Sequence, residues 1–155
     1  MLKLKKILSG GQTGADVDGL KAAKKLGLET GGMMPKGFRT LDGPRKDYAD
    51  LYGIEEHTSW SYPPRTAANA KNSDATIRFA ANFDSAGEKC TLRFINQYKR
   101  PYLDIDVTSP LPLQYVRDWL EKNNISTLNI AGNSEKSSPG IEEFVFNYLV
   151  ELLEG

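Results

Sequence analysis

The sequence has few of the residues that usually mark a metal or redox function. Its 155 residues include one cysteine, Cys90, and one histidine, His57. A single cysteine cannot form a disulfide framework, which is typical of a protein in the reducing cytoplasm. One cysteine and one histidine also cannot make a structural zinc site. We therefore expect a cytoplasmic protein with no metal centre and no evident cofactor, in which Cys90 is a small core residue.

The chain also lacks an excess of positive charge and any long apolar run. Lysine and arginine total 20, as do aspartate and glutamate, so the formal net charge is zero. Nucleic-acid-binding domains usually carry a basic excess, and a membrane-spanning helix needs about 20 consecutive apolar residues. We expect neither a nucleic acid nor a membrane as a partner, and no signal peptide in the start "MLKLKKIL".

The composition and the order of elements are those of a folded α/β protein. With 39% apolar and 26% charged residues, a chain of this length suits one domain over residues 1–155. Apolar patterning predicts strands over 4–9, 75–80, 101–107 and 126–132, and helices over 14–27, 64–72, 86–99, 111–124 and from Pro139 onward. Segment 36–53 reads as a long loop with one helical turn near 45–52. This alternation predicts a three-layer α/β/α fold with a mostly parallel sheet.

Glycine, serine and threonine gather where three predicted strands end. The turns read "SGGQTGAD" from Ser9, "ANFDSAGEKCT" after 75–80 and "AGNSEKSSPG" at the end of 126–132. The carboxyl ends of parallel strands meet at one edge, where helix starts offer free N–H groups to an anion. A single "GG" often makes only a tight turn, and neither GxGxxG nor GxxxxGK[ST] occurs. Three such turns at one edge favour a bound phosphate.

Two cations and two aromatic residues are further binding candidates. Lys36 lies in "PKG" at a strand end, and Arg65 lies at a helix start, where a cation is electrostatically disfavoured without an anionic partner. Tyr48 and Trp60 lie in the long loop region and could stack on a base. The alternatives are a salt bridge for Arg65, Ser138 as an ordinary helix cap, and aromatic residues that only pack the loop onto the sheet.

Catalytic residues are harder to select. No nucleophile elbow GxSxG is present, and nothing in the spacing selects a carboxylate pair. An enzyme that cleaves an N-glycosidic bond would need a carboxylate near the ribose. The candidates are Asp84, Glu88 and Glu135.

Several motifs together resemble a known family. "SGGQTGAD", "GGMMPKG", "DGP", "RTAANAKNSDATIRF" and "LNIAGNSEKSSPGI" are similar, in order and from Ser9 to about Val145, to the circularly permuted YpsA-like branch of the SLOG superfamily. Members of this branch are often called candidate molybdenum carriers. The resemblance implies a Rossmann-like fold that binds a nucleotide or nucleotide-derived ligand at its glycine-rich turns.

The resemblance also implies a set of ligand-binding residues, to which the sequence itself adds Ser9. They are Gly10, Gly11, Gln12, Thr13, Gly14, Lys36, Arg65, Thr66, Asn69, Gly132, Ser134 and Gly140. One turn departs from the family, because "NFDSAGEKCT" stands where a "TGGT"-like turn is expected. The phosphoribohydrolase signature PGGxGTxxE is absent as well, which argues against hydrolysis of a nucleoside monophosphate.

The sequence therefore favours a binding protein for a nucleotide-derived small molecule. It would act as a sensor, carrier or sequestering sponge of a signal such as a cyclic nucleotide or an ADP-ribose derivative. The alternatives are an N-glycosidase or phosphoribohydrolase-type enzyme and a molybdenum-cofactor carrier. The superfamily makes a homo-oligomer plausible.

Overall fold

A five-stranded parallel sheet forms the centre of the protein, in a computed structural model that describes residues 2–154. The strands are β1 (Lys6–Ser9), β2 (Glu29–Gly31), β7 (Ala75–Ala80), β8 (Tyr102–Asp106) and β9 (Thr127–Gly132). Their order is β2-β1-β9-β7-β8, and every pair is parallel. The last strand of the chain thus lies between the first strand and β7.

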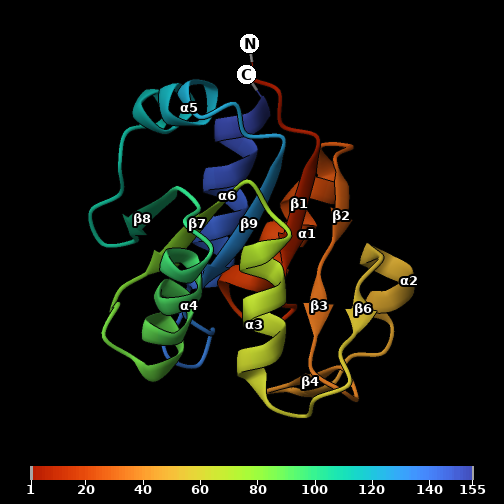
Figure 1. Cartoon of the computed structure of the whole chain (residues 1–155). Helices are drawn as coiled ribbons and strands as arrows, with labels where there is room; N and C mark the ends of the chain where they lie inside the picture. Colours follow the sequence, from red (N-terminus) through yellow and green to blue (C-terminus); the bar gives the residue numbers. More distant parts are fainter. Residues whose placement is uncertain (1, 155) are drawn as a thin grey trace.

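Helices cover both faces of this sheet, as Figure 1 shows. Helices α1 (Ala15–Lys25) and α6 (Ile141–Glu154) pack together on one face, and α5 (Leu113–Lys122) lies against α6. Helices α3 (Tyr62–Lys71) and α4 (Ala86–Gln97) pack together on the other face. The predicted three-layer, Rossmann-like α/β fold is confirmed.

The sequence of β7 shows why this strand is central. Its residues read "ATIRFA", and all six are buried because strands flank it and helices cover both of its faces. On one face the fully buried ring of Phe79 meets the rings of Phe144 and Tyr148 edge-on, with centroids 6.4 and 5.6 Å away. Burial of such side chains stabilises the fold by about 1.5–3 kcal/mol each.

The segment between β2 and α3 is more ordered than a long loop. It holds the short strands β3 (Met33–Met34), β4 (Arg39–Thr40), β5 (Gly43–Pro44) and β6 (Glu55–Glu56), and the helix α2 (Tyr48–Tyr52) within the predicted helical turn. Tyr48 and Tyr52 are buried with Met34 and Ile54 in a second apolar cluster. The prediction that Tyr48 stacks on a base is therefore wrong, because its ring belongs to this cluster.

Helices α3, α5 and α6 each begin two residues away from the start that the sequence predicted. Helix α3 starts at Tyr62, with prolines in its first turn, where a missing N–H costs nothing. Helix α6 starts at Ile141, and the carboxylate of Glu135 accepts hydrogen bonds from the N–H groups of Gly140 and Glu142, at 2.6 and 3.0 Å. The hydroxyl of Ser138 donates to Asn133 instead of capping this helix.

Candidate functional site

A cavity of about 420 Å³ lies between α3 and α4 at the carboxyl ends of the central strands. Each of the three glycine-rich turns contributes to it, through Gly10 after β1, Gly87 after β7 and Gly132 at the end of β9. The chain continues from β9 into α6 on one face of the sheet, and from β7 into α4 on the other face. Such divergence of neighbouring strands is where open α/β sheets bind ligands.

The first turn, "SGGQTGAD", is held by hydrogen bonds within the protein. The N–H of Gly11 donates to the hydroxyl of Ser9 at 3.2 Å, and that of Thr13 donates to the side chain of Gln12 at 3.0 Å. The N–H of Gly14 donates to the carboxylate of Glu142 at 2.9 Å. Because these amides have protein acceptors, they offer less to a phosphate than the sequence suggested.

A glycine is needed at position 14 because the turn after β9 approaches its backbone closely. Its φ of +91° disfavours any side chain, and a Cβ there would lie 2.2 Å from the backbone oxygen of Asn133. This glycine therefore lets the turns after β1 and β9 touch.

The start of α4 lines the same cavity. Ser85 caps this helix, and its hydroxyl accepts a hydrogen bond from the N–H of Glu88 at 3.3 Å. Ala86 and Gly87 line the cavity at the first turn, where backbone N–H groups have no acceptor within the helix. These amides and the positive end of the helix dipole favour a negative ligand group.

Arg65 and Asp16 form a second polar group in the cavity wall. Their nearest atoms, Nη1 and Oδ2, are 3.3 Å apart, and both side chains are largely buried. Burial raises the pKa of Asp16, while the charge of Arg65 lowers it. Within residues 2–154 the buried Nε of Arg65 has no hydrogen-bond partner, so the ion pair with Asp16 does not satisfy all donors of this guanidinium.

Glu88 is a buried carboxyl group in the same cavity. Its Oε2 accepts a hydrogen bond from Asn133 at 3.2 Å, and its Oε1 lies 3.9 Å from Nη1 of Arg78, beyond hydrogen-bond distance. Arg78 makes its strong ion pair with Asp104, at 2.7 Å. Burial raises the pKa of Glu88 to about 7, against the lowering effect of Arg78. Glu88 can therefore donate or accept a proton near neutral pH.

The predicted binding residues divide into those that line this cavity and those that do not. The residues lining it are Gly10, Gln12, Arg65, Thr66, Asn69, Gly132 and Ser134. The residues away from it are Ser9, Gly11, Thr13, Gly14, Lys36 and Gly140. Two of the lining side chains are also structural: Asn69 bonds both backbone groups of Met33, and Gln12 accepts from the N–H of Leu41 at 2.9 Å.

The three catalytic candidates are separated by the structure. Glu88 lines the cavity, whereas Asp84 is exposed outside it and Glu135 caps α6. Reasoning from the sequence selected neither Asp16 nor Asn133, although both line the cavity. The signal for Asn133 was its place directly after the glycine that ends β9.

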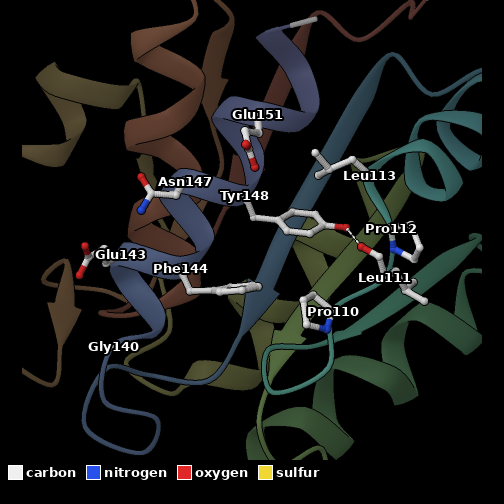
Figure 2. A pocket seen from close by; sticks show the side chains of 10 residues that line it. All are labelled: Pro110, Leu111, Pro112, Leu113, Gly140, Glu143, Phe144, Asn147, Tyr148 and Glu151. Carbon is white, nitrogen blue, oxygen red and sulfur yellow. Dashed lines mark hydrogen bonds between the residues drawn. The ribbon is translucent and has the colours of Figure 1, made fainter.

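A larger hollow of about 660 Å³ lies elsewhere, between α6 and the segment 110–113 (Figure 2). The ring of Tyr148 crosses it, and its hydroxyl donates to the backbone oxygen of Leu111 at 2.7 Å. Gly140 lines this hollow and not the cavity between α3 and α4. The residues that line it include no arginine or lysine, and its two charged side chains, Glu143 and Glu151, would repel a phosphate.

The described residues have neither a cluster of metal-ligating side chains nor a helix that could cross a membrane. Residues 2–154 contain no group of three or more His, Cys, Asp or Glu side chains that could hold a metal ion. In the same part of the chain, no helix is both long and apolar enough to cross a membrane.

Comparison with known proteins identifies the family. Residues 7–153 match the circularly permutated YpsA SLOG family. The chain belongs to this family. The chain is also similar to a crystal structure from Syntrophus aciditrophicus SB, named "Putative molybdenum carrier protein". The identity is 31%, the match covers 99% of this chain and 97% of that one, and the TM-score is 0.88. No curated protein matches the chain.

Proposed function

We propose that the cavity between α3 and α4 binds a nucleotide-derived small molecule. The observation that carries this proposal is that the turns after β1, β7 and β9 line one cavity together with Arg65. A volume of about 420 Å³ is within the range of small-molecule sites. The protein would then sense, carry or sequester such a molecule.

The polar groups suggest how a nucleotide would lie. The amides of Ala86 and Gly87 suit a phosphate, because a helix start favours an anion. Glu88 and Asp16 suit the ribose, because carboxylates accept hydrogen bonds from its hydroxyl groups. A mixed set of donors and carboxyl groups fits a phosphorylated sugar better than a bare oxyanion, which the carboxylates would repel.

Two apolar side chains are available to the base. Leu41 and Tyr62 line the cavity, and Leu41 is 53% exposed there. A planar base could pack between an aliphatic and an aromatic side chain. We therefore assign the base contacts to Leu41 and Tyr62 instead of Tyr48 and Trp60. Neither Tyr48 nor Trp60 lines the cavity, and Trp60 is 58% exposed.

The first experiment is mass spectrometry of small molecules that co-purify with the protein, followed by calorimetric titration with nucleotides and with molybdate. Gly10→Ala is the site variant, because a Cβ there would lie 1.6 Å from Nη1 of Arg65 and displace the guanidinium. We expect it to weaken nucleotide binding at least tenfold.

Gly31→Ala is the matched control, since its Cβ would meet only flexible ends of Lys6 and Leu8, at 3.1 Å or more. Equal nucleotide affinity of both variants and the unchanged protein would refute the site. Binding of molybdate alone would favour a carrier of the kind that the similar structure's name describes.

Glu88 supports a second candidate, an enzyme that cleaves the N-glycosidic bond of a nucleotide. Among the three candidate carboxylates, Glu88 alone lines the cavity, and a group with a pKa of about 7 suits general acid or base catalysis. Chromatography after incubation with nucleotides would show released base, and Glu88→Gln should abolish the release. Recovery of only intact nucleotide after denaturing the complex would exclude this activity.

A further inference from the structure

We propose that the hollow between α6 and the segment 110–113 binds a basic amphipathic helix of a partner protein. Of the described residues, none lines both this hollow and the cavity between α3 and α4, so the proposal does not depend on the ligand of that cavity. The hollow would give the protein a docking surface on the face of the sheet opposite to α4.

Two rows of α6 side chains, one apolar and one polar, run along the hollow (Figure 2). Phe144 and Tyr148 are four residues apart, and their rings stack with centroids 5.7 Å apart. Glu143, Asn147 and Glu151 have the same spacing and form the neighbouring row. Since side chains four residues apart lie on one side of a helix, a partner that lies along α6 meets both rows at once.

The opposite wall of the hollow leaves apolar surface uncovered. Pro110 and Pro112 are exposed, and Leu111 and Leu113 are only half-buried. Helix α5, which follows this wall, lies across one end of α6 instead of alongside it (Figure 1). The chain itself therefore leaves an apolar strip open beside α6, of the kind that often marks an interaction site.

The backbone of this wall has little to offer an extended peptide. Pro110 and Pro112 have no N–H to donate, and the backbone oxygen of Leu111 already accepts from the hydroxyl of Tyr148 at 2.7 Å. An extended peptide would need such groups as partners, whereas a helix satisfies its own backbone. The hollow follows α6 from its first turn to Glu151, about 15 Å, which roughly three turns of a partner helix would fill.

The charge of the hollow favours a basic partner. Of the described residues that line it, only Glu143 and Glu151 are charged; both are exposed, and neither forms an ion pair within residues 2–154. The nearby Arg117 donates to the backbone oxygens of Glu151 and Leu152, at the negative end of α6. The two glutamates lie about 12 Å apart along the helix, so basic side chains two turns apart on a partner helix would meet both.

A second copy of this chain is a poorer occupant. A two-fold contact brings the same surface patch together from both copies. Glu143 and Glu151 of each copy would then face those of the other and repel them. This repulsion favours a different protein, whose basic side chains complement the two carboxylates.

Fluorescence anisotropy with labelled helical peptides of about 15 residues tests the proposal. Two peptides carry leucine along one face, and their flanks carry lysine in one and glutamate in the other. Since the formal net charge of the chain is zero, overall charge favours neither peptide. We expect the lysine peptide to bind at least tenfold more tightly, by a difference that shrinks at high salt. A lysine peptide with alanine in place of leucine should bind at least tenfold more weakly.

Glu143→Lys combined with Glu151→Lys should reverse the preference, so that the glutamate peptide binds more tightly. Glu29→Lys combined with Glu154→Lys is the matched control, because these glutamates are also exposed but line neither the hollow nor the cavity. The control makes the same change in net charge and should keep the preference for the lysine peptide.

Binding of neither peptide, or a preference that the control variant also reverses, would overturn the proposal. Equal binding of the leucine and alanine peptides would do so too, because the apolar strip would then take no part. Sedimentation of the unchanged protein tests for a second copy: a dimer that the lysine peptide dissociates would mean that this copy occupies the hollow, against the proposal. Each of these results leaves the proposed function of the cavity standing.

Discussion

Replacing Glu88 by glutamine should make the protein more stable above neutral pH. The side chain of Glu88 is 4% exposed, and burial raises its pKa from the ordinary 4.5 to about 7. A carboxyl group with a raised pKa binds its proton more tightly in the folded state than in the unfolded state. Its contribution to stability is therefore complete below about pH 4.5 and is lost as the pH rises through about 7.

The size of this loss follows from the shift in pKa. A rise from 4.5 to about 7 corresponds to about 3 kcal/mol. Four groups set this value besides burial: Arg78 and Asn133 lower the pKa, and Asp16 and Asp104 raise it. Glutamine keeps an acceptor for Asn133 but does not ionise.

The assay is urea unfolding of both proteins at pH 5 and pH 8. At pH 5 the two free energies of unfolding should agree within about 1 kcal/mol, since Glu88 is then mostly protonated. At pH 8 the glutamine variant should be more stable by about 2–3 kcal/mol. Only the difference between the two proteins is diagnostic, because Asp18, with a pKa raised to about 6 by burial, destabilises both in the same direction.

A parallel fall in stability of both proteins from pH 5 to pH 8 would refute this reasoning. It would mean that Glu88 is ionised throughout this range, stabilised by Arg78 more strongly than burial disfavours it. The same result would remove the physical basis for Glu88 as a proton donor near neutral pH.

Three further substitutions test the turns and the loop of the hollow in Figure 2. Gly11→Val should lower the melting temperature by several degrees, because φ is +69° and the new Cβ would lie 2.7 Å from Sδ of buried Met34. Gly27→Ala is the control, because its φ is +75° but the space around it is open. An equal fall in melting temperature in both variants would exclude the clash with Met34. Gln12→Ala should cost about 1–2 kcal/mol and speed proteolysis of residues 39–44, because its Oε1 accepts from two backbone N–H groups; unchanged proteolysis would count against this tether. Tyr148→Phe should cost about 1 kcal/mol in urea unfolding, because it removes one 2.7 Å hydrogen bond, and an unchanged midpoint would show that this bond contributes nothing.

Gly11 also shows where reasoning from the sequence fails. From the sequence alone, a glycine in a strand-to-helix turn is interpreted as a surface residue that lets a ligand approach. The sequence therefore predicts that Gly11→Val blocks ligand binding without affecting the fold. In the structure a Cβ at Gly11 would meet Met34, which lies 23 residues later in the sequence and is fully buried. Nothing in the local pattern of either segment shows that contact.

The sequence by itself determined the layers of the fold and the edge of the sheet at which a site could lie. Both follow from local patterns, because apolar spacing selects strands and helices, and parallel strands place their carboxyl ends together. It also found Arg65, whose position at a helix start needs an anionic partner.

The tertiary structure decided which groups at that edge are available to a ligand. Glu142 on α6 occupies the N–H of Gly14, Glu135 caps α6, and Glu88 is buried beside Asn133. These pairings join residues far apart in the sequence, as Gly14 and Glu142 do across 128 positions. Since hydrogen bonding and burial depend on such distant partners, only the folded chain shows which groups at this edge already have partners within the protein.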